Sequence, residues 1–545
     1  MSFSARSSST SPEFTAAAVS APHAVAAQTG RNMLALGANA VEAVVAMGAV
    51  LCVVHPQANS LGGDGFWLIR EPKGRVHYLQ ACGFAGAGAN IKLYRGIGYD
   101  FAPPARGPLA ALATPGLVDG WRCALELSAA FGGRMPLADL LSDAIGHARE
   151  GYGVSLVEAR VNPRDFDALK DAPGFAGAFL VENERAKQGY VRSAARLAVI
   201  LEQLAHAGLR DFYRGDVGRE LAADLERIDA PITRRDIERT NARWRSPLNL
   251  EVRGASLWSA PPPTQGLTGL VLQGLFERLN AGRSDSFEHV HAIIEASKRA
   301  QAITHPVIVD FDHSLEDPAQ FLTRAALDRE GAAISMSRAA SMATSEAGAQ
   351  GSDSQGSAWL GAVDDKGLAV SYVQSIGSEF GSGCVLRTTG ILMQDRADGF
   401  SLDADAINVL APERQPRHSM NPALAAFDDG RVAVYGAGGG DSQAIGQIQA
   451  QILTRLRYGA RVEATIDAPR FLLNRAPEDE IATLKMEDRF DPSVLSALRR
   501  AGHEIKIDDS THSDRFSHGG LLVRWPKGRI DGAHDPRGDG AALGL

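Results

Sequence analysis

The chain has 545 residues, of which 45% are hydrophobic and 22% are charged, and this composition excludes a disordered or fibrous protein. The net charge of −8 is spread along the chain without a basic tract, so nucleic acid is not an expected partner. Length alone allows two to four domains or one large α/β unit.

The first 54 residues contain no segment expected to enter a membrane. Residues 1–14 are polar and serine-rich, lack the apolar core of a signal peptide, and are predicted to be disordered. Residues 38–54 are apolar, but Glu42 interrupts them and they are too short to span a bilayer, so they predict a core helix. The four cysteines are widely spaced and form no CxxC pair, as expected of reduced, buried thiols. We therefore expect a cytoplasmic protein without a membrane partner.

The chain up to residue 356 reads mostly as helix. A short strand at 66–69 follows the glycine turn 61–65, and three prolines at 261–263 interrupt the chain before a further helix. A tract rich in alanine, serine and glycine, 335–356, ends this part and is expected to be mobile. The apolar periodicity predicts helices over 16–36, 39–54, 121–131, 137–150, 191–206, 267–279 and 289–304.

Residues 357–545 show a different pattern, in which strands alternate with glycine-containing turns. Two strands are predicted at 358–364 and 368–375, and a Gly-rich turn at 436–441 leads into a helix over 442–458. Further strands are expected over 390–393, 422–427 and 431–435. The mixture predicts an α+β fold, a layered α/β/β/α sandwich of antiparallel sheets covered by helices.

Ser357 is the candidate nucleophile. It follows Gly356 at the end of the soft tract and stands at the head of a predicted buried strand. That position suggests a self-cleaving amidohydrolase, in which the Gly356–Ser357 bond is cut, the Ser357 hydroxyl attacks, and the freed α-amine is the base. Ser375, at the end of the paired strand, is placed to hydrogen-bond that hydroxyl. The alternatives are a merely solvated serine at Ser357 and an ordinary strand-end serine at Ser375.

The Gly-rich turn at 436–441 is a candidate anion site, because consecutive backbone N–H groups and a helix N-terminus favour negative charge. Its sequence, GAGGGD, is neither GxGxxG nor followed by Lys-Ser/Thr, which disfavours a nucleotide. An oxyanion hole formed by Gly439 and Gly440 is the preferred interpretation. A tight turn without a binding role remains the alternative.

The histidines do not predict a metal site. The pair His289 and His291 and the pair His512 and His518 lack both HxxxH spacing on a helix and neighbouring cysteine ligands. No GxSxG elbow is present, which argues against an α/β-hydrolase. We therefore predict an enzyme that uses no metal or organic cofactor.

Segments along nearly the whole chain, from about residue 22 to 544, resemble the γ-glutamyltranspeptidase family of N-terminal-nucleophile (Ntn) hydrolases. They are Gly37-Ala-Asn-Ala-Val-Glu-Ala43, Leu61-Gly-Gly-Asp-Gly-Phe66, Thr114-Pro-Gly116, Pro261-Pro-Pro263, Glu295-Ala-Ser-Lys298, Phe380-Gly-Ser-Gly383, Gly390-Ile-Leu392, Asp398-Gly-Phe-Ser401, Met420-Asn-Pro422, Gly438-Gly-Gly440, Asp467-Ala-Pro-Arg470 and Asp535-Pro-Arg537. The resemblance implies a four-layer αββα sandwich and a precursor that cleaves itself into a large subunit, 15–356, and a small subunit, 357–545.

The resemblance also implies roles for individual residues. The family's nucleophile is a threonine, and its position is Ser357 here. The hydroxyl that supports the nucleophile falls on Ser375, and the oxyanion glycines fall on Gly439 and Gly440.

The substrate pocket departs from the family pattern, which holds a γ-glutamyl group with an arginine, an asparagine, an aspartate and two serines. The segment of the arginine reads Gln80-Ala-Cys-Gly-Phe84 and contains none. The asparagine and aspartate positions are Gly377 and Gly399, and the serine pair reads His418-Ser419. A zwitterion left unpaired in a buried pocket is costly, so we predict weak or no γ-glutamyl transfer.

Trp359, two residues after Ser357, and the ending Asp535-Pro-Arg-Gly-Asp-Gly540 resemble the family branch that includes oxamate amidohydrolase. The predicted function is cleavage of a small, oxamate-like acid amide through an acyl-enzyme on Ser357, with His418 and Arg417 receiving the acidic group. Three alternatives stay open: a true γ-glutamyltransferase or glutathione hydrolase, a β-lactam or acyl-homoserine-lactone acylase, and an unprocessed non-catalytic relative. A homodimer of the processed subunit pair also stays open.

Overall fold

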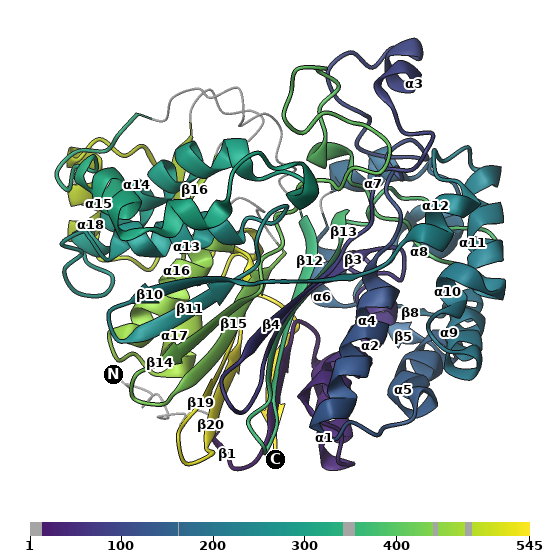
Figure 1. Ribbon diagram of the computed structural model, residues 1–545, viewed down its shortest axis with the longest axis horizontal. Coiled ribbons are helices and arrows are strands. Elements are labelled where there is room, and N and C mark those ends of the chain that lie inside the picture. The colour runs from purple at the N-terminus through teal and green to yellow at the C-terminus, as the bar shows by residue number, and fades with distance from the viewer. Residues whose placement is uncertain (1–12, 162, 342–354, 440–444, 475–481) are drawn as a thin grey trace, which may run out of the picture.

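The computed structural model describes residues 13–161, 163–341, 355–439, 445–474 and 482–545. Its centre is a pair of seven-stranded antiparallel sheets packed face to face (Figure 1). The first sheet runs β21 (Ala541–Gly544), β2 (Ala18–Ala21), β12 (Gln355–Val363), β13 (Ala369–Ser378), β3 (Asp64–Arg70), β4 (Val76–Ala81) and β9 (Arg243–Arg245). The second runs β1 (Glu13–Phe14), β20 (Ile530–His534), β19 (His518–Arg524), β15 (Val432–Gly438), β14 (Ala423–Phe427), β11 (Ala255–Ser259) and β10 (Leu248–Val252).

Helices cover the outer face of each sheet, so the predicted α+β, four-layer sandwich is confirmed (Figure 1). The layer on the first sheet contains α1 (Ala24–Ala35), α2 (Ala40–Val54), α4 (Leu117–Ser128), α5 (Leu137–Glu150), α9 (Ala195–Ala207), α10 (Asp211–Arg214), α11 (Asp216–Arg227) and α12 (Arg234–Arg239). The layer on the second sheet contains α13 (Gly266–Phe276), α14 (Phe287–Thr304), α15 (Arg324–Ala332), α16 (Ile445–Arg457), α17 (Val462–Asp467) and α18 (Pro492–Arg500).

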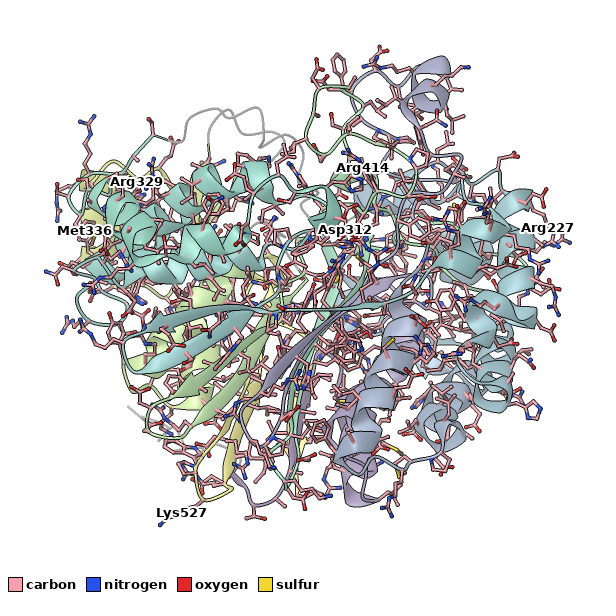
Figure 2. All side chains as sticks on the ribbon, in the orientation of Figure 1. Arg227, Asp312, Arg329, Met336, Arg414 and Lys527 are labelled. Carbon is pink, nitrogen blue, oxygen red and sulfur yellow. The ribbon has the colours of Figure 1, made fainter. Side chains whose placement is uncertain are left out.

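Smaller elements complete the fold. A three-stranded sheet joins β16 (Phe471–Asn474), β17 (Thr483–Glu487) and β18 (Ile505–Asp508), and β5 (Tyr152–Gly153) pairs with β8 (Val191–Arg192), as β6 (Leu180–Val181) does with β7 (Glu184–Arg185). Short helices are α3 (Ile91–Gly96), α6 (Leu156–Ala159), α7 (Pro163–Leu169) and α8 (Phe175–Phe179). Figure 2 shows side chains filling the space between the layers, while the labelled Arg227, Arg329 and Lys527 project at the periphery. Across the described ranges, no helix is both long and apolar enough to cross a membrane.

Four local predictions differ from the structure. The helix predicted over 191–206 begins only at Ala195, because Val191–Arg192 form β8 against β5. The helix predicted over 16–36 begins only at Ala24, because Ala18–Ala21 form β2 between β12 and β21, strands that are distant in the sequence. Residues 13–14 form β1 against β20, although they were expected to be disordered, and residues 1–12 lie outside the described residues. The strand predicted over 390–393 is reduced to isolated bridges. In each case the presence or absence of a strand partner from a distant part of the chain decides the secondary structure, and local periodicity carries no information about that partner.

The side chain of Trp359, on β12 of the first sheet, packs between the two sheets. Its indole is 1% exposed and donates from Nε1 to Ser371 Oγ at 2.9 Å. The facing strands leave room for the ring only because they carry glycine: a Cβ on Gly436 would lie 2.1 Å from Trp359 Cδ1, and one on Gly520 would lie 2.2 Å from Cζ3. The small-to-large fit therefore sets the register of the strand that begins with Gln355 and contains Ser357.

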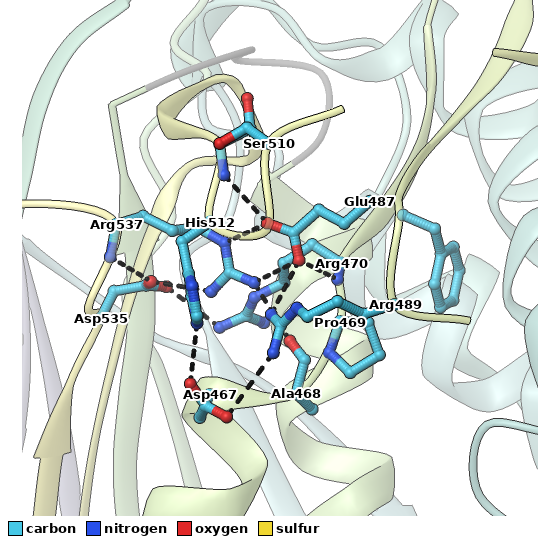
Figure 3. A network of polar contacts seen from close by, with 12 residues as sticks. Asp467, Ala468, Pro469, Arg470, Glu487, Arg489, Ser510, His512, Asp535 and Arg537 are labelled. Atoms are coloured by element: carbon cyan, nitrogen blue, oxygen red, sulfur yellow. Dashed lines mark hydrogen bonds and ion pairs between the residues drawn. The ribbon is translucent and has the colours of Figure 1, made fainter. Parts of the chain in front are cut away.

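A buried ionic network joins two segments that the sequence places far apart (Figure 3). Arg470 Nη2 is 3.1 Å from Asp535 Oδ2, Arg537 Nη1 is 2.8 Å from Asp535 Oδ1, and Arg537 Nη2 is 2.6 Å from Glu487 Oε2. Burial would raise the pKa of Asp535, but Arg470 and Arg537 outweigh it and hold that pKa below its ordinary value. Asp535 also accepts the Gly519 N–H at 2.8 Å, which links the network to β19.

Candidate active site

Ser357, Ser375 and Asp64 stand in one row across the first sheet. Ser357 on β12 is the register partner of Ser375 on β13, and Ser375 is in turn the partner of Asp64 on β3. Their exposed fractions are 4%, 2% and 0%. Antiparallel pairing thus brings together three polar residues from distant parts of the chain at one level of the sheet.

The Gly356–Ser357 peptide is held in a distorted part of β12. The pairing with β13 shifts register between these two residues, as at a β-bulge. The sequence predicts a hydrogen bond from Ser375 to the Ser357 hydroxyl, and this is wrong: Ser375 Oγ donates to the Gly356 carbonyl oxygen at 2.5 Å and accepts the Gly377 N–H at 2.9 Å. Gly356 has no room for a side chain, because a Cβ there would lie 2.7 Å from the Gln57 carbonyl oxygen. The carbonyl that precedes Ser357 is therefore fixed and polarised by a hydroxyl donor.

Gly439, directly after β15 of the second sheet, contacts the nucleophile candidate. Its N–H donates to Ser357 Oγ at 3.1 Å, and its φ of +68° is in the left-handed region that favours glycine. The neighbouring Gly438 also needs its missing side chain, because a Cβ would lie 2.7 Å from the Ser357 carbonyl oxygen. The other predicted oxyanion glycine, Gly440, lies outside the described residues.

Asp64 and Arg396 form a buried charged pair behind Ser375. Asp64 accepts the N–H groups of Gly83 at 2.9 Å and Gly116 at 3.0 Å, and Arg396 Nε lies 3.3 Å from its Oδ2. Arg396 Nη2 donates to the Ser375 carbonyl oxygen at 3.1 Å. Burial raises the pKa of Asp64, and Arg396 with the two backbone donors opposes that shift. The pair connects the backbone of Ser375 to a second set of polar groups.

His418 belongs to that second set. Its Nε2 lies 3.8 Å from Asp64 Oδ2, and Phe66 packs edge-on against its ring at 4.9 Å between centroids. Neither ring nitrogen has a hydrogen-bond partner among the described residues. Burial, reinforced by Arg396, lowers the pKa of His418 well below its usual value, so the imidazole is neutral at physiological pH. It is therefore an uncharged group with free hydrogen-bonding capacity, and the half-buried Ser419 follows it in the chain.

The remaining predicted pocket residues, Gly377 and Gly399, lie in different surroundings. Gly377 adjoins the Gly356 carbonyl through β12–β13 pairing, but a Cβ on it would lie 1.9 Å from Asp395 Oδ1, so no asparagine fits there. Gly399 packs against Pro416 and Arg417 instead. Arg417 Nη1 bonds His305 Nε2 at 3.0 Å, and burial lowers the pKa of Arg417 to about 10.

Asp64 and Arg396 were missed by the sequence reasoning. Asp64 lies within the Leu61–Phe66 segment, for which the sequence predicts a glycine turn and a family resemblance but no role for this carboxylate, and it opens a strand that is buried up to Ile69. A carboxylate at the head of a buried apolar strand is unusual unless it is paired, and that signal pointed to a functional or structural partner. Its partner, more than 300 residues away in the chain, carries no such local signal.

The fold is that of an Ntn-type hydrolase. The family model described as "Gamma-glutamyltranspeptidase" matches residues 26–545, and the chain belongs to that family. The predicted enzyme class, an autoprocessing amidohydrolase or related acyltransferase, is thereby confirmed.

Individual relatives and solved structures match over nearly the full length. The chain is 41% identical to the oxamate amidohydrolase proenzyme of Klebsiella pneumoniae over 96% of this chain and 97% of that protein. It is 32% identical to a glutathione hydrolase-like proenzyme of Bacillus subtilis, with 97% and 98% covered. The crystal structure of a cephalosporin acylase from Bacillus halodurans superimposes with a TM-score of 0.89 at 25% identity, covering 100% of this chain and 98% of that one. Relatives named as proenzymes indicate a precursor that is cleaved into two subunits.

Proposed function

We propose that the chain cuts its own Gly356–Ser357 bond and then hydrolyses a small acid amide, such as oxamate, through an acyl-enzyme on Ser357. The observation that carries the proposal is the pair of hydrogen bonds at this peptide. Ser375 Oγ donates to the Gly356 carbonyl oxygen, and the Gly439 N–H donates to Ser357 Oγ. One donor polarises the bond to be broken, and the other positions the attacking oxygen.

Autoprocessing follows from this geometry. Ser357 Oγ attacks the Gly356 carbonyl carbon, and the Ser375 hydroxyl stabilises the negative charge that develops on the carbonyl oxygen. The peptide C–N bond breaks, the Ser357 nitrogen takes up a proton, and the resulting ester is hydrolysed by water. The products are a large subunit ending at Gly356 and a small subunit beginning at Ser357. Strands from both subunits remain in the first sheet, because β2, β3, β4 and β9 precede this boundary and β13 and β21 follow it.

The amide reaction reuses the same oxygen. The freed α-amine of Ser357 has a reference pKa of about 7.7–8.0, so about a fifth to a third of it is neutral at physiological pH and accepts the hydroxyl proton. Ser357 Oγ attacks the substrate amide, the amine departs with a proton, and water releases the acid. Gly439, together with Gly440, is assigned to the oxyanion hole, where one donor typically contributes about 2.7–4 kcal/mol to the transition state.

The choice of a small acid amide rests on the pocket and on a relative. The family resemblance puts Gly377 and Gly399 at the positions of the asparagine and the aspartate of a γ-glutamyl pocket, and a side chain at Gly377 would clash with Asp395. Arg396, which also pairs with Asp64, has its guanidinium beside Ser375, and the nitrogens of neutral His418 have no hydrogen-bond partner among the described residues; we assign these two side chains to the carboxylate of the substrate. Ser419, the kept member of the serine pair, is assigned to the same pocket. The relative named as an oxamate amidohydrolase proenzyme is 41% identical over 96% of the chain.

Two further parts of the proposal concern the setting of the enzyme. All four cysteines are free and buried, as suits a reducing compartment, and we retain the prediction of a cytoplasmic protein. A homodimer of the processed pair is also retained, and the molecular mass measured by light scattering tests it.

The nucleophile is tested by comparing Ser357→Ala with Ser357→Thr. We expect the alanine variant to remain a single inactive chain, whereas the threonine variant, which keeps a hydroxyl, is processed. Intact mass and N-terminal sequencing give the readout. Normal two-fragment processing of Ser357→Ala would remove Ser357 from the role.

The substrate is tested on processed wild-type protein with a coupled assay for released ammonia. Oxamate should be hydrolysed, and a chromogenic γ-glutamyl anilide should be turned over at least tenfold less efficiently in kcat/KM. Preference for the anilide would overturn the substrate assignment and leave the self-processing proposal intact.

A further inference from the structure

A second cluster of ligand-type side chains lies away from the nucleophile, at the junction of α14 with the turn after α18. His291 and Glu295 are one turn apart on α14, and His503 follows α18. One ligand atom from each of the three residues lies within 4.8 Å of the others. Their exposed fractions are 0%, 3% and 7%, so the cluster is closed to solvent.

His291 and Glu295 each have one polar atom that points away from the cluster, and that atom is hydrogen-bonded to the backbone of residues 335–340. His291 Nε2–H donates to the Ser335 carbonyl oxygen at 2.9 Å, which leaves the lone pair of Nδ1 directed at His503 Nε2, 2.8 Å away. Glu295 Oε2 accepts the Ala340 N–H at 2.9 Å, which leaves Oε1 on the inner side. Outer hydrogen bonds of this kind fix the tautomer and orientation of metal ligands in proteins.

Two separations between the inner atoms lie on either side of the spacing that a tetrahedral ion requires, and the third is at most 4.8 Å. His291 Nδ1 and His503 Nε2 are 2.8 Å apart, and His503 Nε2 is 4.0 Å from Glu295 Oε1. Ligands about 2.0–2.2 Å from a tetrahedral zinc ion are separated by roughly 3.3–3.5 Å. Side-chain shifts of several tenths of an ångström would lengthen the distance between the two histidine nitrogens and shorten the distance from His503 Nε2 to Glu295 Oε1 to these values. Two imidazoles and one carboxylate are a donor set suited to the zinc class of ions.

Lys298 is the group that competes with an ion at this place. Its Nζ lies 2.7 Å from Glu295 Oε1 and 2.8 Å from the Ala340 carbonyl oxygen. Because the ammonium is at the rim, with 11% of the side chain exposed, it has a second partner to keep when an ion takes Oε1. Removing its charge should therefore strengthen binding of a cation.

We propose that His291 Nδ1, Glu295 Oε1 and His503 Nε2 form a structural site for one divalent transition-metal ion of the zinc class, with water as a fourth ligand. The site lies across the boundary proposed at Gly356–Ser357, because His291 and Glu295 precede it and His503 follows it. It also fastens residues 335–340, whose Ala339 N–H donates to the Ala501 carbonyl oxygen at 2.7 Å. The ion would tie the end of the large subunit to the small one.

The test is a titration of tag-free, metal-stripped wild-type protein with Co²⁺, which has visible absorption in a tetrahedral site, followed by competition with Zn²⁺. We expect one equivalent to bind with a tetrahedral spectrum, and Zn²⁺ to displace it. Absence of a saturable one-equivalent signal from the wild-type protein overturns the proposal without recourse to any variant.

Variants then assign the site. His503→Asn should lose more than tenfold in Co²⁺ affinity, whereas His512→Asn, a half-buried histidine paired with Asp467 at 2.8 Å, should bind as the wild type does. Lys298→Gln should bind more tightly than the wild type. Unchanged binding by His503→Asn, or loss in His512→Asn alone, would overturn the assignment. Circular dichroism establishes whether each variant is folded. If His503→Asn is unfolded, the wild-type titration alone decides whether the metal site exists.

Discussion

Replacing Ser375 by alanine isolates the hydroxyl that contacts the Gly356 carbonyl. The substitution removes one donor, at 2.5 Å from the carbonyl oxygen, and one acceptor for the Gly377 N–H. The backbone of β13 and its register with β12 and β3 depend on main-chain hydrogen bonds and stay in place. We therefore expect a protein that folds but cleaves itself slowly.

The change in the free energy of unfolding and the change in the cleavage rate distinguish a structural effect of Ser375→Ala from a catalytic one. Two lost hydrogen bonds reduce the free energy of unfolding by about 1–3 kcal/mol. Loss of a donor to a developing oxyanion slows the reaction by about 10²–10³-fold, which corresponds to about 2.7–4 kcal/mol in the activation free energy. A modest drop in melting temperature with at least a hundredfold slower cleavage is the expected combination.

The assay follows the loss of full-length chain by intact mass after purification, with incubation at constant temperature and pH. Ser378→Ala is the matched control, since Ser378 is on the same strand and 7% exposed, and its side chain makes no hydrogen bond among the described residues. It should process as the wild type does. Wild-type kinetics in Ser375→Ala, with the fold retained, would refute the assignment of Ser375 as the donor.

Three further predictions concern stability and thiol reactivity. Gly436→Ala, whose Cβ would lie 2.1 Å from Trp359, should lower the free energy of unfolding by about 1–3 kcal/mol in urea titrations, whereas Gly146→Ala, in an open helical position, should not lower it. Asp535→Asn should destabilise by about 3–5 kcal/mol because Arg470 and Arg537 stay buried. Because folding lowers the pKa of Asp535, its carboxylate stabilises the folded state above about pH 3.9, and this stabilisation is lost as pH falls below that value. The melting temperature of Asp535→Asn should therefore fall less steeply with acid than that of the wild type. Equal slopes for the two proteins would contradict this. The four cysteines are buried, and burial raises the pKa of Cys384 to about 11, so a thiol reagent should react fully only after denaturation, and rapid labelling of the native protein would contradict the packing.

Local sequence identified the parts of the site that depend on residue type. Ser357 after Gly356, at the start of an apolar strand, predicted a nucleophile, and the turn containing Gly439 predicted a backbone donor, because only small residues allow such close approach and positive φ. The same reasoning predicted the helices over 137–150 and 289–304 within two residues of their ends. Amphipathic periodicity over three or four turns is a strong local signal.

Long-range pairing was beyond the reach of local sequence. Local periodicity predicts a helix from residue 16, since nothing nearby in the chain shows that 18–21 lie between β12 and β21. The same limit hid the contact of Asp64 with Arg396 and that of His291 with His503. In each case the two partners come from segments whose adjacency is created by the fold.

The sequence by itself determined the family, the layered architecture and the serine at the proposed cleavage boundary, because these depend on residue types in a fixed order. Only the tertiary structure decided which groups surround that serine. Antiparallel register aligned Ser357 with Ser375 and Asp64, and the packing of Trp359 against glycines in the second sheet held that register in place. Contacts between distant strands are set by the burial of shared surfaces, which acts only once the whole sandwich has formed.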